Sequence, residues 1–189
     1  GVTSYCPTTV AAPLDLTLSA LERLADAIAG KEDSGDGQAL PCGIHLEGPF
    51  ISHVRRGVHP PANLLPPTVE MFERFWQAAR GQVRLITIAP ELPGALEVIA
   101  EAVRRGVCVS LGHSDADLAT TRRAVELGAR HATHTFNAMR PLDHRQPGIL
   151  GEVLTDSRMT ADIIVDGIHL DPVIVDLFLK AKGPEGAVL

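Results

Sequence analysis

The sequence predicts an α/β protein built on parallel strands. Strand-like and helix-like segments alternate along the chain with short connections, which is typical of strand–helix–strand units. Strand-like segments begin near residues 83, 107 and 131, about 24 residues apart, a normal period for such units. Polar side chains of the kind that bind ligands stand at the ends of several of these segments. Two architectures fit this pattern, an eight-stranded barrel and an open doubly wound sheet.

The first part of the chain starts with a β-rich segment and a helix. Residues 2–9 are rich in β-forming residues. Apolar residues at helical spacing then predict a helix over residues 14–29, which Gly30 ends. Residues 31–38 are polar and contain glycine, so we expect a surface loop there, and residues 43–48 form the next predicted strand.

A long connection follows, over residues 50–67. It contains four prolines and a group of basic side chains, namely His53, Arg55, Arg56 and His59. Connections of this length are uncommon in a compact domain unless they are functional or mobile. We therefore expect this loop to contribute to a site.

Strands and helices alternate regularly from there on. Helices are predicted over residues 68–79, 94–105, 116–127, 149–156 and 172–182. Strands are predicted over residues 83–89, 107–113, 131–136, 159–165 and 187–189. The start and stop signals are Thr68, Gly106, Ser114 or Asp115, Gly128 and Pro172. No Gly-x-Gly-x-x-Gly sequence follows the first strand, and site-type residues occur at several strand ends, so we favour the barrel.

Composition limits the possible functions. The net charge of the 189 residues is −6 and no block of Lys or Arg occurs, which argues against a nucleic-acid-binding surface but allows a local pocket for one phosphate. The cysteines at positions 6, 42 and 108 include no CxxC and predict buried thiols in a reducing compartment. No apolar run reaches the length of a membrane span and no signal peptide is visible, so we expect a cytoplasmic protein without a membrane partner.

One carboxylate and two imidazoles stand at the ends of buried-looking strands. Glu47 ends the segment 43–48, His113 ends the segment 107–113, and His134 lies in the segment that starts near residue 131. One Glu and two His are a sufficient ligand set for a catalytic zinc-type ion that keeps one position open. Such an ion polarises a carbonyl and lowers the pKa of its water, so hydrolysis of an amide or ester is the expected reaction.

Strand alternation adds detail to this predicted metal site. His113 continues the row of Val109 and Leu111, so it is expected to point over the barrel mouth. His45 shares a side with Glu47 and is expected to lie beneath it as support.

Other polar residues are candidates for proton transfer and for substrate binding. The candidate bases are Asp115, Asp166 and Asp171, although each of them also fits a helix cap or a loop turn. Arg145 and His169 have the chemistry to hold an anionic group such as phosphate. Asn137 and the backbone at Ala138 have the chemistry to hold polar substrate groups.

Five strings of residues resemble N-acetylglucosamine-6-phosphate deacetylases, a family of the amidohydrolase superfamily of metal-dependent barrel enzymes. They are His-Leu-Glu-Gly-Pro-Phe (45–50), Gly-His-Ser-Asp-Ala (112–116), Thr-His-Thr-Phe-Asn-Ala-Met (133–139), Arg-Gln-Pro-Gly (145–148) and Asp-Gly-Ile-His (166–169). They occur in order, with fitting spacing, over nearly the whole chain. The resemblance implies an incomplete TIM-type (β/α)8 barrel that removes the N-acetyl group from N-acetylglucosamine 6-phosphate in amino-sugar catabolism.

The resemblance also implies a role for individual positions. Its metal ligands are Glu47, His113 and His134. The catalytic and substrate-binding positions are Val58, His59, Asn137, Ala138, Arg145 and His169. In this set His59 polarises the acetyl carbonyl, and Arg145 and His169 hold the phosphate. The Arg acts across a subunit interface in the family, so a homodimer is expected. The cofactor is a divalent ion, zinc or iron, with one or two ions bound.

Two parts of the family pattern are missing from residues 1–189. The first barrel strand and the small β-sandwich domain are expected before Gly1, and the last barrel strand, with the catalytic Asp, is expected beyond Leu189. Residues 1–189 are thus predicted to form one catalytic barrel domain, truncated at both ends and inactive alone. The alternatives are another amidohydrolase, such as a dihydroorotase-like enzyme or an N-acyl amino-acid hydrolase, and a non-catalytic barrel that binds a sugar phosphate.

Overall fold

The structure, a computed structural model, describes residues 2–30 and 38–189 and is an α/β fold with parallel strands, as predicted. The helices are α1 (Leu14–Ala29), α2 (Val69–Ala78), α3 (Ala95–Arg104), α4 (Leu118–Glu126), α5 (Gly148–Thr155) and α6 (Pro172–Gly186). The strands are β1 (Ser4–Tyr5), β2 (Thr8–Thr9), β3 (Leu40–Pro41), β4 (Ile44–Glu47), β5 (Val83–Ile88), β6 (Cys108–Leu111), β7 (His131–Ala132), β8 (Ala161–Asp162) and β9 (Ala187–Val188).

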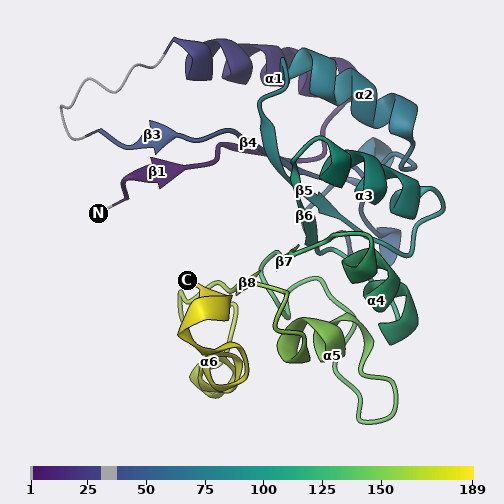
Figure 1. The fold of residues 1–189 in the computed structure, drawn as a ribbon, viewed down its shortest axis with the longest axis vertical. Coiled ribbons are helices and arrows are strands. Elements are labelled where there is room, and N and C mark those ends of the chain that lie inside the picture. Colours follow the sequence, from purple (N-terminus) through teal and green to yellow (C-terminus); the bar gives the residue numbers. More distant parts are fainter. Residues whose placement is uncertain (1, 31–37) are drawn as a thin grey trace.

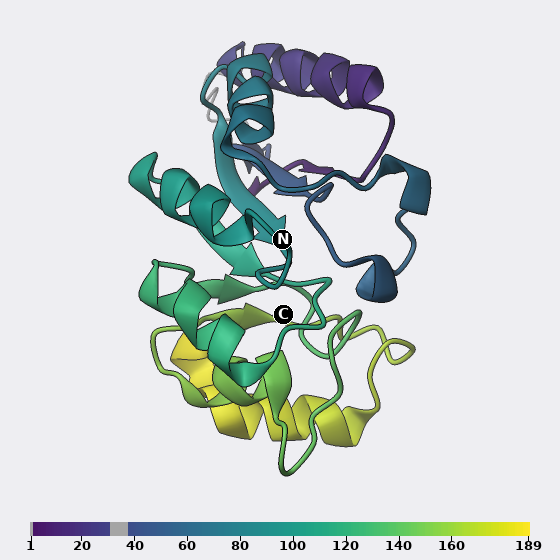
Figure 2. The same cartoon turned by 90° about the vertical axis from the view of Figure 1, so that its right-hand side faces the viewer.

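Within each sheet the strands follow one another in chain order, and β1 pairs with β3 in parallel. A five-stranded parallel sheet has the order β2-β4-β5-β6-β7, and β8 pairs with β9, also in parallel. Backbone hydrogen bonds from Ala132 N to Thr160 O (3.0 Å) and from Thr135 N to Asp162 O (2.8 Å) join β7 to the β8 segment. A doubly wound sheet reverses its strand order at a switch point, and the described strands contain no such reversal. The helices follow the strands around one side of this series (Figures 1 and 2).

Most predicted elements occur, but several boundaries differ. Helix α2 is capped by Thr68, whose Oγ1 accepts a hydrogen bond from Met71 N, as expected. Helix α4 is instead capped by Asp117, because Ser114 and Asp115 bond to other side chains. Helix α6 runs beyond its predicted end across a break at Gly183, where φ is +65°. The predicted loop at residues 31–38 lies almost wholly outside the described residues.

The two faces of the central strands differ in chemistry. On one face, Ile44 and Leu46, Ile86 and Ile88, and Val109 and Leu111 are fully buried in the hydrophobic core. The opposite face carries His45, Glu47, Thr87 and Ser110, which follows from the two-residue period of a strand and from the pairing of Thr87 with both Glu47 and Ser110. The polar face is therefore the side of the strands away from the helices, here called the inner side. It extends to the carboxyl ends of the strands.

The prediction of three buried thiols is wrong for Cys42 and Cys108, which are exposed, whereas Cys6 is partly exposed. Cys108 is the first residue of β6 and shares the inner, polar face with Ser110 by alternation, so the core does not cover it. The Sγ atoms of Cys6 and Cys42 lie 3.3 Å apart, and burial together with Cys42 raises the pKa of Cys6 to about 11. None of the described helices is long and apolar enough to cross a membrane.

Candidate metal centre

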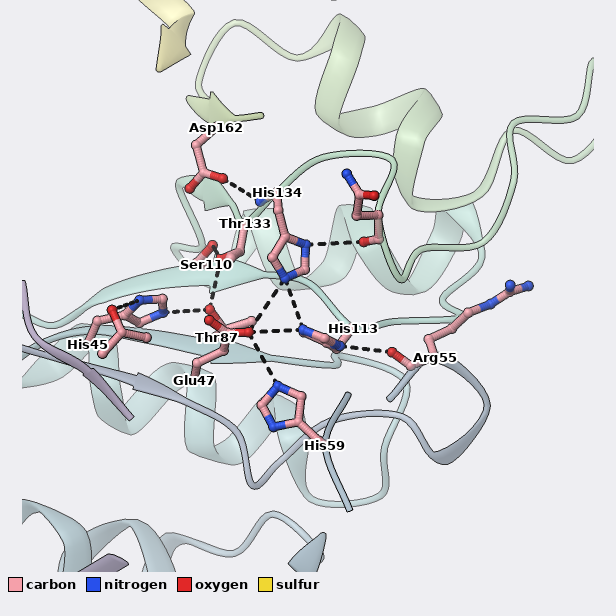
Figure 3. Close-up of polar contacts among 12 residues, drawn as sticks. His45, Glu47, Arg55, His59, Thr87, Ser110, His113, Thr133, His134 and Asp162 are labelled. Atoms are coloured by element: carbon pink, nitrogen blue, oxygen red, sulfur yellow. Dashed lines mark hydrogen bonds and ion pairs between the residues drawn. The ribbon is translucent and has the colours of Figure 1, made fainter. Parts of the chain in front are cut away.

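Three ligand-type atoms converge at the ends of β4, β6 and β7 (Figure 3). Glu47 Oε1 lies 3.0 Å from His113 Nε2 and 3.5 Å from His134 Nε2, and the two Nε2 atoms are 2.9 Å apart. In a tetrahedral site with bonds of about 2.0–2.1 Å, neighbouring ligand atoms are about 3.3–3.4 Å apart. The three observed separations bracket this value. The residues that are far apart in the sequence thus meet as predicted.

The orientation of the two imidazole rings differs from the one that two-residue strand alternation predicts. Ser110 faces the inner side, so two-residue alternation would place His113 with Val109 and Leu111 on the core side. The structure ends β6 at Leu111 and gives His113 a φ of +47°, in the left-handed region. His134 likewise has a positive φ, of +35°, and its strand β7 ends earlier than predicted, at Ala132. These sparsely populated conformations, which cost on the order of 1–3 kcal/mol each, turn both rings toward Glu47.

Backbone carbonyls fix the protonation of both rings. His113 Nδ1 lies 2.9 Å from Arg55 O, and His134 Nδ1 lies 3.2 Å from Asn137 O. A carbonyl oxygen only accepts, so each Nδ1 carries a proton and donates it. In the neutral rings both Nε2 atoms are then unprotonated and point at one another and at a carboxylate. This is the arrangement that supports histidine ligands in metal sites.

Such a group of acceptors requires a positive charge between them. Without an ion, protons take that role. Burial opposes the ionised form of Glu47, but hydrogen bonds from the surrounding imidazoles outweigh it and hold the pKa of Glu47 far below its usual range. Burial also opposes charge on His134, yet the hydrogen bond to Glu47 raises the pKa of His134. The donor set of one carboxylate and two Nε2 atoms therefore fits a divalent cation.

His59 joins this group as a donor. Ala11 N donates to His59 Nδ1 (3.1 Å), so the neutral ring carries its proton on Nε2, which lies 3.3 Å from Glu47 Oε1. The side chain is almost fully buried, and its ring meets that of His113 edge-on at 4.7 Å between centroids. His59 thus presents an N–H, and not a lone pair, to the centre of the site.

Sequence reasoning missed two carboxylates that hold the ligand loops. Asp162, in β8, accepts a hydrogen bond from the backbone N of His134 and lies 3.0 Å from His131 Nε2. Glu91 accepts from Ser114 Oγ (2.7 Å) and from Asp115 N (2.6 Å), directly after His113. For Asp162 the sequence offered one signal, a charged residue inside an apolar strand. For Glu91 the sequence offered no signal.

The predicted support by His45 takes another form. His45 lies on the same strand face as Glu47, but its hydrogen bonds go to Thr8 Oγ1 (3.2 Å) and Thr87 Oγ1 (2.8 Å). Burial lowers the pKa of His45 to about 4, against the opposing effect of Glu47. The ring is therefore neutral at physiological pH.

The three candidate bases have structural roles. Asp115 accepts hydrogen bonds from Arg55 (2.8 Å) and Arg140 (3.1 Å). Asp171 caps α6. Asp166 accepts hydrogen bonds from the backbone N atoms of Ile168 and His169. Burial opposes ionisation of Asp115, but its two arginine partners outweigh this and lower its pKa. None of the three bonds to a ligand of the candidate centre within the described part of the chain.

The predicted substrate residues surround the centre without forming one group. Val58 is 90% exposed on the long loop, and Ala138 has a φ of +53°. Asn137 Nδ2 is buried and has no hydrogen-bond partner among the described residues. Arg145 lines a cavity of about 390 Å³ with Arg140. His169 bonds to Asp166 (2.7 Å), and no hydrogen bond within the described residues joins it to Arg145.

The fold and the cluster define a class: a parallel α/β protein with a candidate metal centre at its strand ends. No family model matches the chain. Over its full length the chain is 43% identical to N-acetylglucosamine-6-phosphate deacetylase of Bos taurus and 38% identical to that of Bacillus subtilis strain 168, covering 46% and 48% of these proteins. The crystal structure of the Mycobacterium smegmatis deacetylase matches with a TM-score of 0.91 and 40% identity, over 99% of this chain and 47% of that one. A second M. smegmatis structure is an aspartate-to-alanine variant in complex with N-acetyl-D-glucosamine-6-phosphate.

The chain is similar to the N-acetylglucosamine-6-phosphate deacetylases, in sequence and in fold. It spans about half the length of the curated relatives that it matches. The resemblance predicted from the five sequence strings is thereby confirmed.

Proposed function

We propose that this chain forms part of a metal-dependent N-acetylglucosamine-6-phosphate deacetylase, which converts its substrate into glucosamine 6-phosphate and acetate. The observation that carries the proposal is the convergence of Glu47, His113 and His134, with both imidazoles held as Nε2 acceptors by backbone carbonyls. Relatives named for this activity match the chain from end to end.

Residues 1–189 form a single domain, an incomplete (β/α)8 barrel of the amidohydrolase kind. Parallel strands in chain order, with the ligands at their carboxyl ends, support this proposal. The match to the M. smegmatis deacetylase structure supports it as well.

Glu47, His113 and His134 hold a divalent ion, for which zinc and iron both suit the ligand types. When bound, such an ion would supply Lewis acidity, which polarises a carbonyl and lowers the pKa of water toward neutrality. His59 directs its Nε2–H toward the acetyl carbonyl oxygen and stabilises the negative charge that develops there. Ala11 N fixes its tautomer in advance, so Nε2 already carries the proton that it donates.

The sugar and its phosphate are held by residues around the centre. Asn137 contributes a buried amide donor that lacks an internal partner among the described residues, and Ala138 and Val58 contribute backbone and apolar contacts. Arg145 and His169 bind the phosphate, with Arg145 acting across the interface of a homodimer. The exposure of Arg145 on the loop before α5 supports this role.

Acetate release from phosphorylated and unphosphorylated N-acetylglucosamine tests the proposal. Replacement Arg145→Ala is expected to lower kcat/KM for the phosphorylated sugar about 10- to 100-fold, the value of hydrogen bonds to a charged group, and to leave the unphosphorylated sugar unaffected. Arg74→Ala, on the exposed surface of α2, is the control. Equal activity of full-length Arg145→Ala and wild type on both sugars would remove the phosphate assignment, and absence of acetate release by the full-length wild-type protein would remove the function.

Gly57 allows a second test, because it lies against a ligand ring. Its φ is +57°, and a Cβ there would lie 3.1 Å from His113 Cε1. We expect Gly57→Ala to lower stability by about 1–2 kcal/mol through the left-handed backbone and to weaken metal binding about 10-fold by displacing His113. Gly167→Ala is the matched control, since its φ is +75° and nothing lies within 4 Å of its added Cβ. Thermal melts measure the loss of stability, and zinc titrations measure the loss of metal affinity. Equal metal affinity of both variants would show that the contact between position 57 and His113 does not affect metal binding.

A further inference from the structure

A continuous chain of polar side chains crosses the inner face of the strands beneath the metal ligands (Figure 3). Thr8 and His45 are 3.2 Å apart, His45 and Thr87 2.8 Å, Thr87 and Thr133 2.8 Å, and Thr133 and Ser110 2.5 Å. The members come from β2, β4, β5, β6 and the residue after β7, so the chain joins five consecutive strands. Thr87 and Ser110 are fully buried, and His45 and Thr133 are nearly so.

The direction of these hydrogen bonds follows from Thr8, at one end of the series of polar side chains. The Thr8 hydroxyl donates to the backbone carbonyl of Cys6 (3.1 Å). A hydroxyl has one proton, so Thr8 Oγ1 must accept from His45, and Nδ1 of His45 must carry the proton. The Nε2 atom of this neutral ring then accepts from Thr87.

The remaining hydrogen bonds of this series run in the same direction. Thr87 Oγ1 accepts from the hydroxyl of Thr133, and Thr133 Oγ1 accepts from the hydroxyl of Ser110. Each proton in the chain finds one acceptor. In the opposite direction Thr133 would donate to Ser110, and the buried Ser110 hydroxyl would then need a second acceptor, which does not occur among the described residues.

We propose that Thr8, His45, Thr87, Thr133 and Ser110 form a one-directional hydrogen-bond chain that holds His45 as the Nδ1–H tautomer and positions the metal ligands. The positioning role rests on the proposed metal centre. Each ligand lies one to three residues beyond a member of the chain: Glu47 after His45, His113 after Ser110, and His134 after Thr133. A change in the relative placement of these strands moves the ligand atoms directly.

Thr87 is the residue whose replacement tests this positioning best, since it joins His45 to Thr133. Thr87→Val keeps the shape of the side chain but leaves Nε2 of His45 without a donor and the Thr133 hydroxyl without an acceptor. Loss of a residue that supports metal ligands typically lowers metal affinity 10- to 100-fold, and we expect about that loss of zinc affinity here. Thr87→Ser retains the hydroxyl and is expected to bind zinc within about threefold of wild type.

Thr121→Val is the matched control. Thr121, in α4, is also fully buried, and its hydroxyl donates to the carbonyl of the cap residue Asp117, outside the polar chain. Zinc affinity is measured by competition with a chelator on the full-length, folded proteins. A Thr87→Val protein that binds zinc as tightly as wild type overturns the positioning role, as does a Thr121→Val protein that loses as much affinity.

The tautomer of His45 is tested separately in the wild-type protein, so the test does not depend on folding of a variant. Long-range proton–nitrogen NMR spectra of ¹⁵N-labelled protein distinguish an unprotonated Nε2 from an unprotonated Nδ1. We expect the Nδ1–H form with and without zinc, because His45 is not a ligand. The Nε2–H form would overturn the proposed direction. A wild-type protein that shows the Nδ1–H form but binds no zinc would overturn the metal centre and the positioning role, and keep the direction.

Discussion

Replacement of His113 by alanine is expected to abolish stoichiometric metal binding and to lower acetate release by more than about 1,000-fold. The variant keeps Glu47 and His134 but loses the ring whose Nε2 lies 3.0 Å from Glu47 Oε1 and 2.9 Å from His134 Nε2. Two remaining ligands do not make a zinc-type site. Loss of the Lewis acid removes several kcal/mol of transition-state stabilisation, and about 4 kcal/mol corresponds to this factor in rate.

His144→Ala is the matched control for this experiment. His144 lies on the loop before α5, and its side chain is 80% exposed. We expect its metal content and kcat to equal those of wild type. A His113→Ala protein that retains one tightly bound ion per chain and wild-type turnover would contradict the ligand assignment.

Replacement of His59 by alanine is expected to separate catalysis from metal binding. His59 presents its Nε2–H to the site because Ala11 N occupies Nδ1, so the ring is a donor and not a ligand. Loss of one hydrogen bond to a developing oxyanion typically lowers kcat about 100- to 1,000-fold, and we expect a loss in that range. Zinc affinity should change by less than about threefold.

Steady-state kinetics and zinc titration of the same preparation measure both quantities. His53→Ala is a suitable control, since His53 is an exposed residue of the same loop. Loss of the ion from His59→Ala would show that the ring is a ligand. Unchanged kcat would show that it contributes no oxyanion contact.

The sequence allowed prediction of the helices and the identity of the ligands, because both depend on local signals. The apolar spacing from Leu14 to Ile28 and the stop at Gly30 are properties of one segment, and α1 spans the predicted range. Glu47, His113 and His134 each follow a buried strand, and parallel strands bring such ends together.

The details of the site depend on contacts between segments, which local patterns do not contain. Alternation suggested the wrong reason for the orientation of His113, since a left-handed residue after Leu111 turns the ring. Support by Asp162 and Glu91 depends on loops that approach from other strands. The bonds of His45 to Thr8 and Thr87 depend on the stagger of neighbouring strands, which the sequence does not specify.

Anomalous X-ray diffraction at the zinc absorption edge, from crystals of the protein grown with zinc, shows directly whether an ion lies between the three ligands. The predicted result is one strong peak within about 2.0–2.2 Å of Glu47 Oε, His113 Nε2 and His134 Nε2, with both Nδ1 atoms still bonded to the carbonyls of Arg55 and Asn137. A well-ordered structure with these three side chains in place and no peak between them, at zinc concentrations that saturate binding, would contradict the account.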